Sequence, residues 1–344
     1  MSELNIAILG AGSIGCYLGG LLTHAGQSVS FIGRARYQKA IAENGLRLTH
    51  LTRSPIALEP DRIDFHAAPD EISRALGDAD IVALCTKSQD TQAAAAQIKA
   101  HCKAGVLVVS FQNGVRNPET LKAVLPPETV LAAIVPFNVT PAGDGAFHCG
   151  TEGELIIEAS HDAQLTQLKI GFESARQGVK LSDNIEGDQW AKMIVNLNNG
   201  LNTLSGGTLR EGLLQRDYRR ALGLLVAEGL SVAKARGIKV GTFNGRSPDS
   251  LLKVLSLPNF AYRIVMQVIV KIDAKARSSM LDDLEAGRGS EVDYLQGEIV
   301  RQAAAANISA PYNTAALDAV KAAFHAGASP KLSGSEILAL LKPT

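Results

Sequence analysis

Long uninterrupted apolar runs, paired cysteines and an excess of either charge are all missing from this chain of 344 residues. Its 34 basic and 34 acidic residues cancel, which argues against nucleic acid or an anionic membrane as a partner held by bulk charge. The four cysteines form no CxxC pair, so we expect reduced thiols, a cytoplasmic location and no metal centre. The first residues lack a basic segment before an apolar run, so we expect neither a signal peptide nor a membrane span there.

The best later candidate for a membrane span is FAYRIVMQVIVKIDAKA, at residues 260–276. Arg263 and Lys271 interrupt it, so we predict a buried helix in a soluble protein instead. A chain of this length is too long for most single cores, which favours two domains. Without a charge imbalance, a small molecule is the expected partner.

Short β-branched runs alternate with alanine-rich stretches in the first half of the chain. This alternation predicts a parallel sheet covered by helices, an α/β fold of the Rossmann type. The predicted strands are 5–9, 28–32, 81–85, 106–110 and 130–135, and the clearest helices between them are 14–25 and 92–100.

The alternation of strand-like and helix-like segments stops after residue 135. Glycines punctuate residues 138–159, which predicts antiparallel edge strands at which the sheet ends. From about residue 188 the pattern is helical, most clearly at 218–236 and 291–306. Residues 244–258 carry glycine and prolines and are predicted to form a loop between helices. We therefore expect an α/β domain over 1–185 and an all-α domain over 186–344.

A GxGxxG motif, Gly10-Ala-Gly12-Ser13-Ile14-Gly15, stands between the first predicted strand and the first predicted helix. In such a loop the first glycine permits a tight turn, the second lets backbone approach a pyrophosphate, and the third lets helix pack on strand. The phosphates of a dinucleotide then bind at the helix N-terminus, here at Ser13 and Ile14. In this context the motif predicts a dinucleotide site.

The second predicted strand ends in an arginine. A binder of plain NAD would usually place there a carboxylate for the ribose hydroxyls. Arg34 could instead bind the 2′-phosphate of NADP through two hydrogen bonds, with Arg36 close by. The pattern predicts NADPH/NADP+ as the cofactor, and a solvated surface arginine is the alternative at both positions.

Lys192, Asn196 and Asn199 follow one another at spacings of four and three on an apolar helical segment. These spacings place them on one helix face. A lysine there is costly unless it has partners or a task, and burial would lower its pKa. The alternative is a lysine that reaches to the domain surface.

A second polar segment follows in SSMLDDLEAGRGSEVDYLQGEIV, which contains Ser278, Ser279 and Glu291. Glu291 is predicted to open a helix with Ser290 as its N-cap. Its simplest interpretation is an acid in the first helical turn, stabilised by the helix dipole.

These motifs together resemble the ketopantoate reductase family, the 2-dehydropantoate 2-reductases, over nearly the whole chain. The segments that carry the resemblance are the glycine loop with its arginine, LCTKSQDT around Lys87, VVSFQNGV around Asn113, WAKMIVN around Lys192, and the segment that ends around Glu291.

The resemblance implies NADPH-dependent reduction of a 2-keto acid, ketopantoate, to (R)-pantoate for pantothenate and coenzyme A synthesis. It implies an NADP-binding Rossmann domain (1–185), a helical substrate and dimerisation domain (186–344), and an active site in the cleft between them. Hydride would reach the C2 ketone while Lys192 acts as general acid and Glu291 keeps the lysine placed.

The remaining roles also follow from the resemblance. It assigns substrate contacts to Asn196 and Ser279, and we expect Asn199 to orient the substrate beside them. It places Asn113 near both nicotinamide and substrate, and Lys87 close to the cofactor.

One departure concerns substrate choice. The family commonly has an asparagine where this chain has Gly200, and either Asn199 or Asn202 could take its place. A different 2-keto acid or an opine-type substrate on the same fold is therefore the alternative, and a non-catalytic NADP-sensing protein is a third interpretation. The sequence leaves the oligomeric state open, a homodimer included.

Overall fold

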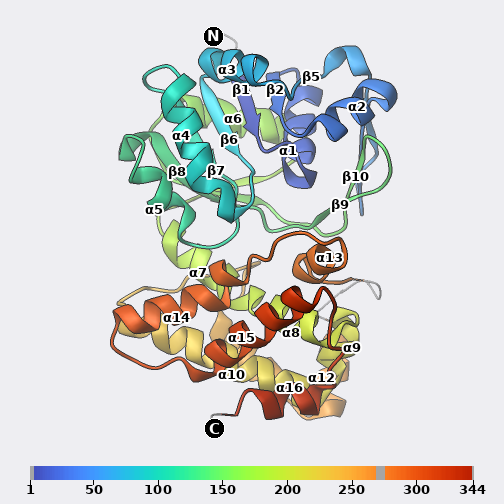
Figure 1. The fold of residues 1–344 in the computed structure, drawn as a ribbon, viewed down its shortest axis with the longest axis vertical. Helices are drawn as coiled ribbons and strands as arrows, with labels where there is room; N and C mark the ends of the chain where they lie inside the picture. Colours follow the sequence, from blue (N-terminus) through green and yellow to red (C-terminus); the bar gives the residue numbers. More distant parts are fainter. Residues whose placement is uncertain (1–3, 269–275, 343–344) are drawn as a thin grey trace. The chain divides into compact units, whose positions relative to one another are not determined.

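The computed structural model describes residues 4–268 and 276–342, and the chain divides into two compact units, Met1–Ile185 and Glu186–Thr344 (Figure 1). The first unit is built on an eight-stranded sheet with the order β12-β11-β8-β7-β6-β1-β2-β5. Its strands are β1 (Asn5–Leu9), β2 (Ser28–Ile32), β5 (Asp64–His66), β6 (Ile81–Leu84), β7 (Leu107–Ser110), β8 (Val130–Ile134), β11 (Leu155–Glu158) and β12 (Val179–Ser182).

Six of these strands, β5-β2-β1-β6-β7-β8, run parallel. Numbered along the chain, their order is that of the doubly wound dinucleotide-binding sheet. The predicted α/β fold is confirmed, and the five predicted strands lie where the β-branched runs are.

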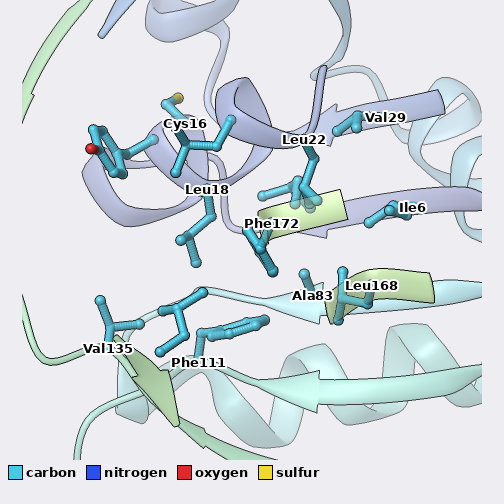
Figure 2. Close-up of a cluster of buried hydrophobic side chains, with 14 of the residues drawn as sticks. Ile6, Cys16, Leu18, Leu22, Val29, Ala83, Phe111, Val135, Leu168 and Phe172 are labelled. Atoms are coloured by element: carbon cyan, nitrogen blue, oxygen red, sulfur yellow. The ribbon is translucent and has the colours of Figure 1, made fainter. Parts of the chain in front are cut away.

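Helices cover both faces of this sheet. One face carries α1 (Ser13–His24), α2 (Ala35–Asn44) and α6 (Ala163–Ser174), and the other carries α3 (Pro69–Asp78), α4 (Thr91–His101) and α5 (Asn117–Lys122). Figure 2 shows Leu18 and Leu22 of α1 beside Phe172 of α6, in one cluster with Ile6 and Ala83 of the sheet. All five side chains are buried, so both helices are held by apolar contact.

The prediction that the sheet ends after residue 135 is wrong. Residues 136–154 leave the sheet, but β11 then returns antiparallel to β8, and β12 pairs parallel with β11. The detour contributes to a separate four-stranded sheet, β4-β3-β10-β9, with β3 (Leu46–His50), β4 (Ile56–Leu58), β9 (Val139–Pro141) and β10 (Ala146–Cys149). The antiparallel pairing predicted for this region is present between β9 and β10.

Short 3-10 turns connect several of these elements, at Pro60–Arg62, Ser88–Asp90 and Pro127–Thr129.

Burial raises the pKa of the Cys85 thiol to about 12. Within residues 4–268 and 276–342 all four cysteines are free thiols.

The second unit is helical in its described part, as predicted. Its elements are α7 (Ile185–Asn196), α8 (Asn198–Ser205), α9 (Leu209–Leu214), α10 (Arg216–Ala235), α11 (Pro248–Leu255), α12 (Asn259–Val268), α13 (Ser279–Glu285), the 3-10 turn η4 (Val292–Tyr294), α14 (Gln296–Ala305), α15 (Pro311–Ala326) and α16 (Gly334–Leu340). The long helix α10 packs against α9, α11, α14, α15 and α16 and supplies much of the core.

The prediction of a loop over 244–258 is wrong, because helix α11 lies within it. Its prolines mark helix boundaries: Pro248 occupies the first turn of α11 behind the N-cap Ser247, and Pro258 precedes α12. Arg219 of α10 holds this segment, donating to the Leu255 carbonyl oxygen at 3.3 Å. Its guanidinium also lies over the Tyr262 ring, 4.1 Å from the centroid.

The prediction of a buried helix over 260–276 needs correction in its described part. Helix α12 is formed, and Tyr262 on it is buried. Phe260 and Ile264 are 73% and 59% exposed, so residues 259–265 of the helix are not fully buried. Residues 269–275 lie outside the described residues. No helix of the part that the structure describes has the length and apolarity to cross a membrane.

Candidate active site

The predicted cofactor residues of the first unit meet at one edge of the sheet. The glycine loop follows β1, Arg34 follows β2, Lys87 follows β6 and Asn113 follows β7. These four strands are neighbours and parallel, so their carboxyl ends share one edge. Ligands of open α/β sheets bind at that edge.

Glycine suits the three positions of the glycine loop for different structural reasons. Gly10 has φ +102°, and a Cβ there would lie 2.6 Å from the Thr86 nitrogen. A Cβ at Gly15 would run into the Gly10 carbonyl oxygen. At Gly12 the backbone is extended, and a Cβ would meet nothing within 4 Å among the described residues. The fold therefore requires glycine at 10 and 15, whereas the space over Gly12 suits the close approach of a ligand.

The start of α1 fits an anion. Its first turn has no acidic residue, and its N-cap is Gly12, which has no side chain that could accept from the first amides. Ser13 and Ile14, the first residues of the helix, are only half-buried. Amide groups at a helix N-terminus bind phosphate, so these residues suit the pyrophosphate of a dinucleotide.

The two arginines after β2 differ in their surroundings. Arg34 is exposed and stands at the N-cap of α2, and its side chain makes no hydrogen bond or ion pair with another described residue. The Arg36 guanidinium lies over the neighbouring Tyr37 ring, 4.8 Å from the centroid. Of the two side chains, Arg34 is the better placed to meet a phosphate.

The loops that carry Lys87 and Asn113 are held together by side chains that sequence reasoning did not single out. Gln112 donates to the Lys87 carbonyl oxygen at 3.4 Å. Ser88 and Asn117 both donate to the Asn113 carbonyl oxygen, at 3.3 Å and 2.6 Å. Gln112 lies in the segment VVSFQNGV and could have been singled out from the sequence, because a buried amide side chain needs several hydrogen-bond partners.

The central side chain of the second unit is Lys192, on α7. It is only 8% exposed, and burial lowers the pKa of its ammonium group to about 8. The charge of Glu291 opposes this lowering, so the fold brings the two residues into electrostatic range although they are far apart in sequence. An ammonium group that titrates near neutrality can give or take a proton under ordinary conditions.

The surroundings of Glu291 differ from the prediction of a helix over 291–306. Glu291 is buried and stands at the N-cap of the 3-10 turn η4, and α14 begins only at Gln296. The prediction of Ser290 as the N-cap is wrong, because Glu291 holds that position; the Ser290 hydroxyl instead accepts from the Val292 amide at 3.1 Å, just before η4. The dipole of an α-helix therefore does not account for Glu291.

The polar line expected after Lys192 is interrupted. Helix α7 ends at Asn196 and α8 begins at Asn198, so Asn196 and Asn199 lie on two helices. Both asparagines are half-buried. The structure keeps Lys192 and Asn196 on one helical turn and separates Asn199 from them at Leu197.

Of the two candidates to replace the asparagine that the family has at position 200, Asn202 makes hydrogen bonds within the fold. It is fully buried, accepts from the Ser278 amide at 2.9 Å and donates to the Gly207 carbonyl oxygen at 3.0 Å. Its side chain therefore joins α8 to the start of α13. Asn199 is half-buried and is therefore the more accessible of the two.

The two serines of the SSM segment have separate positions. Ser278 is buried and caps α13, accepting from the Leu281 amide at 3.2 Å. Ser279 is the first residue of α13 and is half-buried, so its hydroxyl is the more accessible of the two. Among the described residues, no group of three or more His, Cys, Asp or Glu side chains could hold a metal ion.

Known proteins resemble this chain along both units. The family described as ketopantoate reductase PanE/ApbA matches residues 6–161, and its C-terminal counterpart matches residues 184–324. A 2-dehydropantoate 2-reductase from Pyrococcus abyssi is 30% identical over 318 residues, which cover 90% of this chain and 94% of that protein.

Solved structures show the same fold. A PanE/ApbA family ketopantoate reductase from Ralstonia eutropha JMP134 is 31% identical, with a TM-score of 0.78 over 94% of this chain and 99% of that one. A D-mandelate dehydrogenase solved with NADH and anilino(oxo)acetate has a TM-score of 0.76 at 19% identity, over 94% of this chain and 99% of that one. Because family matches cover most of both units and a 30% identical relative spans 90% of the sequence, this chain belongs to the ketopantoate reductase family.

Proposed function

We propose that this protein reduces 2-dehydropantoate (ketopantoate) to (R)-pantoate with NADPH, supplying pantothenate and coenzyme A synthesis. The observation that carries the proposal is the buried Lys192 on α7: burial lowers its pKa to about 8, and the charge of Glu291 opposes this lowering. Family membership supports the substrate, and Arg34 at the end of β2 supports NADPH over NADH.

The chemistry needs a donor at the ketone oxygen. Negative charge develops on that oxygen while hydride reaches C2, and a buried ammonium group stabilises such charge strongly. Lys192 would hydrogen-bond the oxygen and deliver the proton, and Glu291 would keep the ammonium group placed and charged. Asn196, Asn199, Asn113 and Ser279 would orient the carboxylate and hydroxyl groups of the substrate.

The cofactor would lie along the carboxyl edge of the sheet. Gly10, Gly12 and Gly15, with the amides of Ser13 and Ile14, would hold its pyrophosphate, and Arg34 its 2′-phosphate. Lys87 and Asn113 would lie near its other end, as the order of β1, β6 and β7 suggests. When bound, the reduced nicotinamide supplies the hydride.

Replacing Gly12 with alanine tests the cofactor assignment. A Cβ at Gly12 would meet no described residue within 4 Å, so we expect an unchanged Tm. The Kd for NADPH should rise about ten- to a hundredfold, because forcing a methyl group into a close-packed contact costs about 1–3 kcal/mol. Fluorescence titration and thermal unfolding measure the two quantities.

Gly15→Ala is the matched control for that substitution. Its Cβ would run into the Gly10 carbonyl oxygen, so Gly15→Ala should lower the Tm as well as the affinity. Wild-type NADPH affinity in Gly12→Ala would contradict the proposed position of the pyrophosphate.

A second candidate keeps the fold and changes the substrate. Gly200 stands where the family commonly has an asparagine, and the D-mandelate dehydrogenase of the same fold was solved with NADH and anilino(oxo)acetate. An aromatic or other 2-keto acid, or an opine-type substrate, is therefore the alternative. A third interpretation is an NADP-sensing protein without catalysis. Whether the purified protein forms a homodimer is a separate measurement.

The deciding assay follows nicotinamide absorbance with purified protein, ketopantoate and either NADPH or NADH, beside a panel of other 2-keto acids. We expect fast oxidation of NADPH with ketopantoate and slow oxidation of NADH. Turnover of another keto acid but not ketopantoate would favour the second candidate. No turnover with any of them, together with tight NADPH binding, would favour a sensing role.

A further inference from the structure

The junction between α7 and α8 stands between two groups of candidate site residues. Lys192 and Asn196 lie before it on α7, and Asn199 lies after it on α8. At the junction, the Leu197 amide donates to the Ile194 carbonyl oxygen at 3.3 Å, a bond three residues back instead of the four of an α-helix. The geometry of this one residue decides how the two groups stand relative to each other.

A side chain from α14 binds this junction. Gln296 Nε2 donates to the Leu197 carbonyl oxygen at 2.8 Å, and the Gln296 side chain is fully buried. Gln296 is the first residue of α14 and follows the turn that Glu291 opens. The amide therefore links the Glu291 segment to the junction beyond Lys192.

The position of Gln296 depends on a glycine. A Cβ built on Gly200 would lie 2.5 Å from Gln296 Nε2 and 3.1 Å from Gln296 Cδ. No side chain at 200 fits while the Gln296 amide is in place. Where the family commonly has an asparagine, the amide of Gln296 occupies the space next to residue 200.

The hydrogen bond to Leu197 uses only one of the two polar atoms of the Gln296 side chain. Among the described residues, Gln296 Oε1 is buried and has no hydrogen-bond partner. An unpaired buried acceptor is unfavourable, so an apolar residue would be the simpler choice if filling space were the sole task.

We infer that Gly200 and Gln296 act as one positioning pair, which sets how Lys192 and Asn196 on α7 stand relative to Asn199 on α8. Neither residue of the pair is assigned contact with the reacting atoms. The inference rests on the proposed function for its kinetic part, and on the Gln296 contacts alone for its structural part.

A double-mutant cycle tests the pair. We expect Gly200→Ala to lower the Tm in the wild-type background and to have little effect in the Gln296→Ala background, because the added Cβ then has room. Gly223→Ala is the matched glycine control, since a Cβ there would meet no described residue within 4 Å. It should leave the Tm unchanged or raise it.

Kinetics separate positioning from general stability. Gln296→Ala should lower kcat/KM for the 2-keto acid about tenfold or more, since small misplacements of catalytic groups are costly, and leave the KM for NADPH unchanged. Gln302→Ala is the matched glutamine control. Gln302 is buried on the same helix but donates to Glu298 at 2.8 Å, so its loss should lower the Tm without changing either kinetic constant.

The outcomes are distinct. Equal effects of Gly200→Ala in both backgrounds, or identical kinetics in Gln296→Ala and Gln302→Ala, would overturn the pair while wild-type turnover upholds the proposed function. Absence of wild-type turnover with every 2-keto acid overturns the proposed function and the kinetic part with it. The unfolding cycle then still decides whether the two residues are coupled.

Discussion

Lys192→Met is expected to lower kcat for 2-keto acid reduction by about 10²–10⁴-fold, the usual contribution of a positioned general acid. The methionine keeps the apolar part of the buried side chain and removes only the ammonium group. Because Lys192 is nearly buried and assigned to the ketone oxygen, NADPH binding should change little. Stopped-flow single turnovers and NADPH titrations measure the two quantities separately.

Lys234→Met is the matched control for this substitution. Lys234 lies in the last turn of α10 in the same unit, and its side chain is exposed. It should keep wild-type kcat and Tm. If Lys192→Met retained kcat within a factor of a few of this control, Lys192 would not be the general acid.

The pH profile follows from the same residue. Lys192 must carry a proton to donate it, so reduction should be active below its pKa of about 8 and decline as the pH rises through that value. The reverse oxidation needs the neutral amine and should increase over the same range. Glu291→Gln removes the charge that raises the Lys192 pKa, so the declining limb should move to lower pH. A limb that stayed in place in Glu291→Gln would contradict the pairing of the two residues.

Arg34→Ala is expected to raise the KM for NADPH about 10- to 100-fold, because hydrogen bonds to a charged group contribute about 1.5–3 kcal/mol. The KM for NADH should stay near the wild-type value, since NADH lacks the 2′-phosphate. The measurement is initial-rate kinetics with both cofactors at saturating keto acid.

Arg36→Ala provides the comparison for Arg34. Its guanidinium contacts the Tyr37 ring, so its loss should have a small effect on the KM for either cofactor. If Arg34→Ala affected NADPH and NADH equally, or if Arg36→Ala had the larger effect on NADPH, the assignment of the 2′-phosphate to Arg34 would be wrong.

The doubly wound sheet could be predicted because its signals are local. Runs such as NIAIL and the glycine loop after it are short, and period and turn chemistry identify them without knowledge of distant residues. The four-stranded sheet was missed for the opposite reason. Its β3 and β10 lie almost a hundred residues apart, as the pairing of Arg47 with Ala146 shows, and only the folded chain brings them together.

The helical unit shows a similar limit. The prolines at 248 and 258 indicated a loop, because proline breaks a helix. Proline also favours the first turn of a helix, and a single sequence does not show which of the two applies. The segment after Glu291 was predicted as one helix, whereas the structure divides it into a 3-10 turn and α14. Boundaries of this kind depend on tertiary contacts such as that of Gln296.

The sequence by itself determined which residues are candidates for the chemistry: the glycine loop, Arg34 and Lys192 stand out by type and spacing, and Glu291 stands out through the family resemblance. Tertiary structure alone decided the state of these residues. Burial lowers the pKa of Lys192 while the distant Glu291 opposes the shift, Asn202 is committed to the backbone of its neighbours, and Gln296 lies against Gly200. Each of these facts depends on distance and solvent exclusion between residues far apart in the chain, which no local pattern contains.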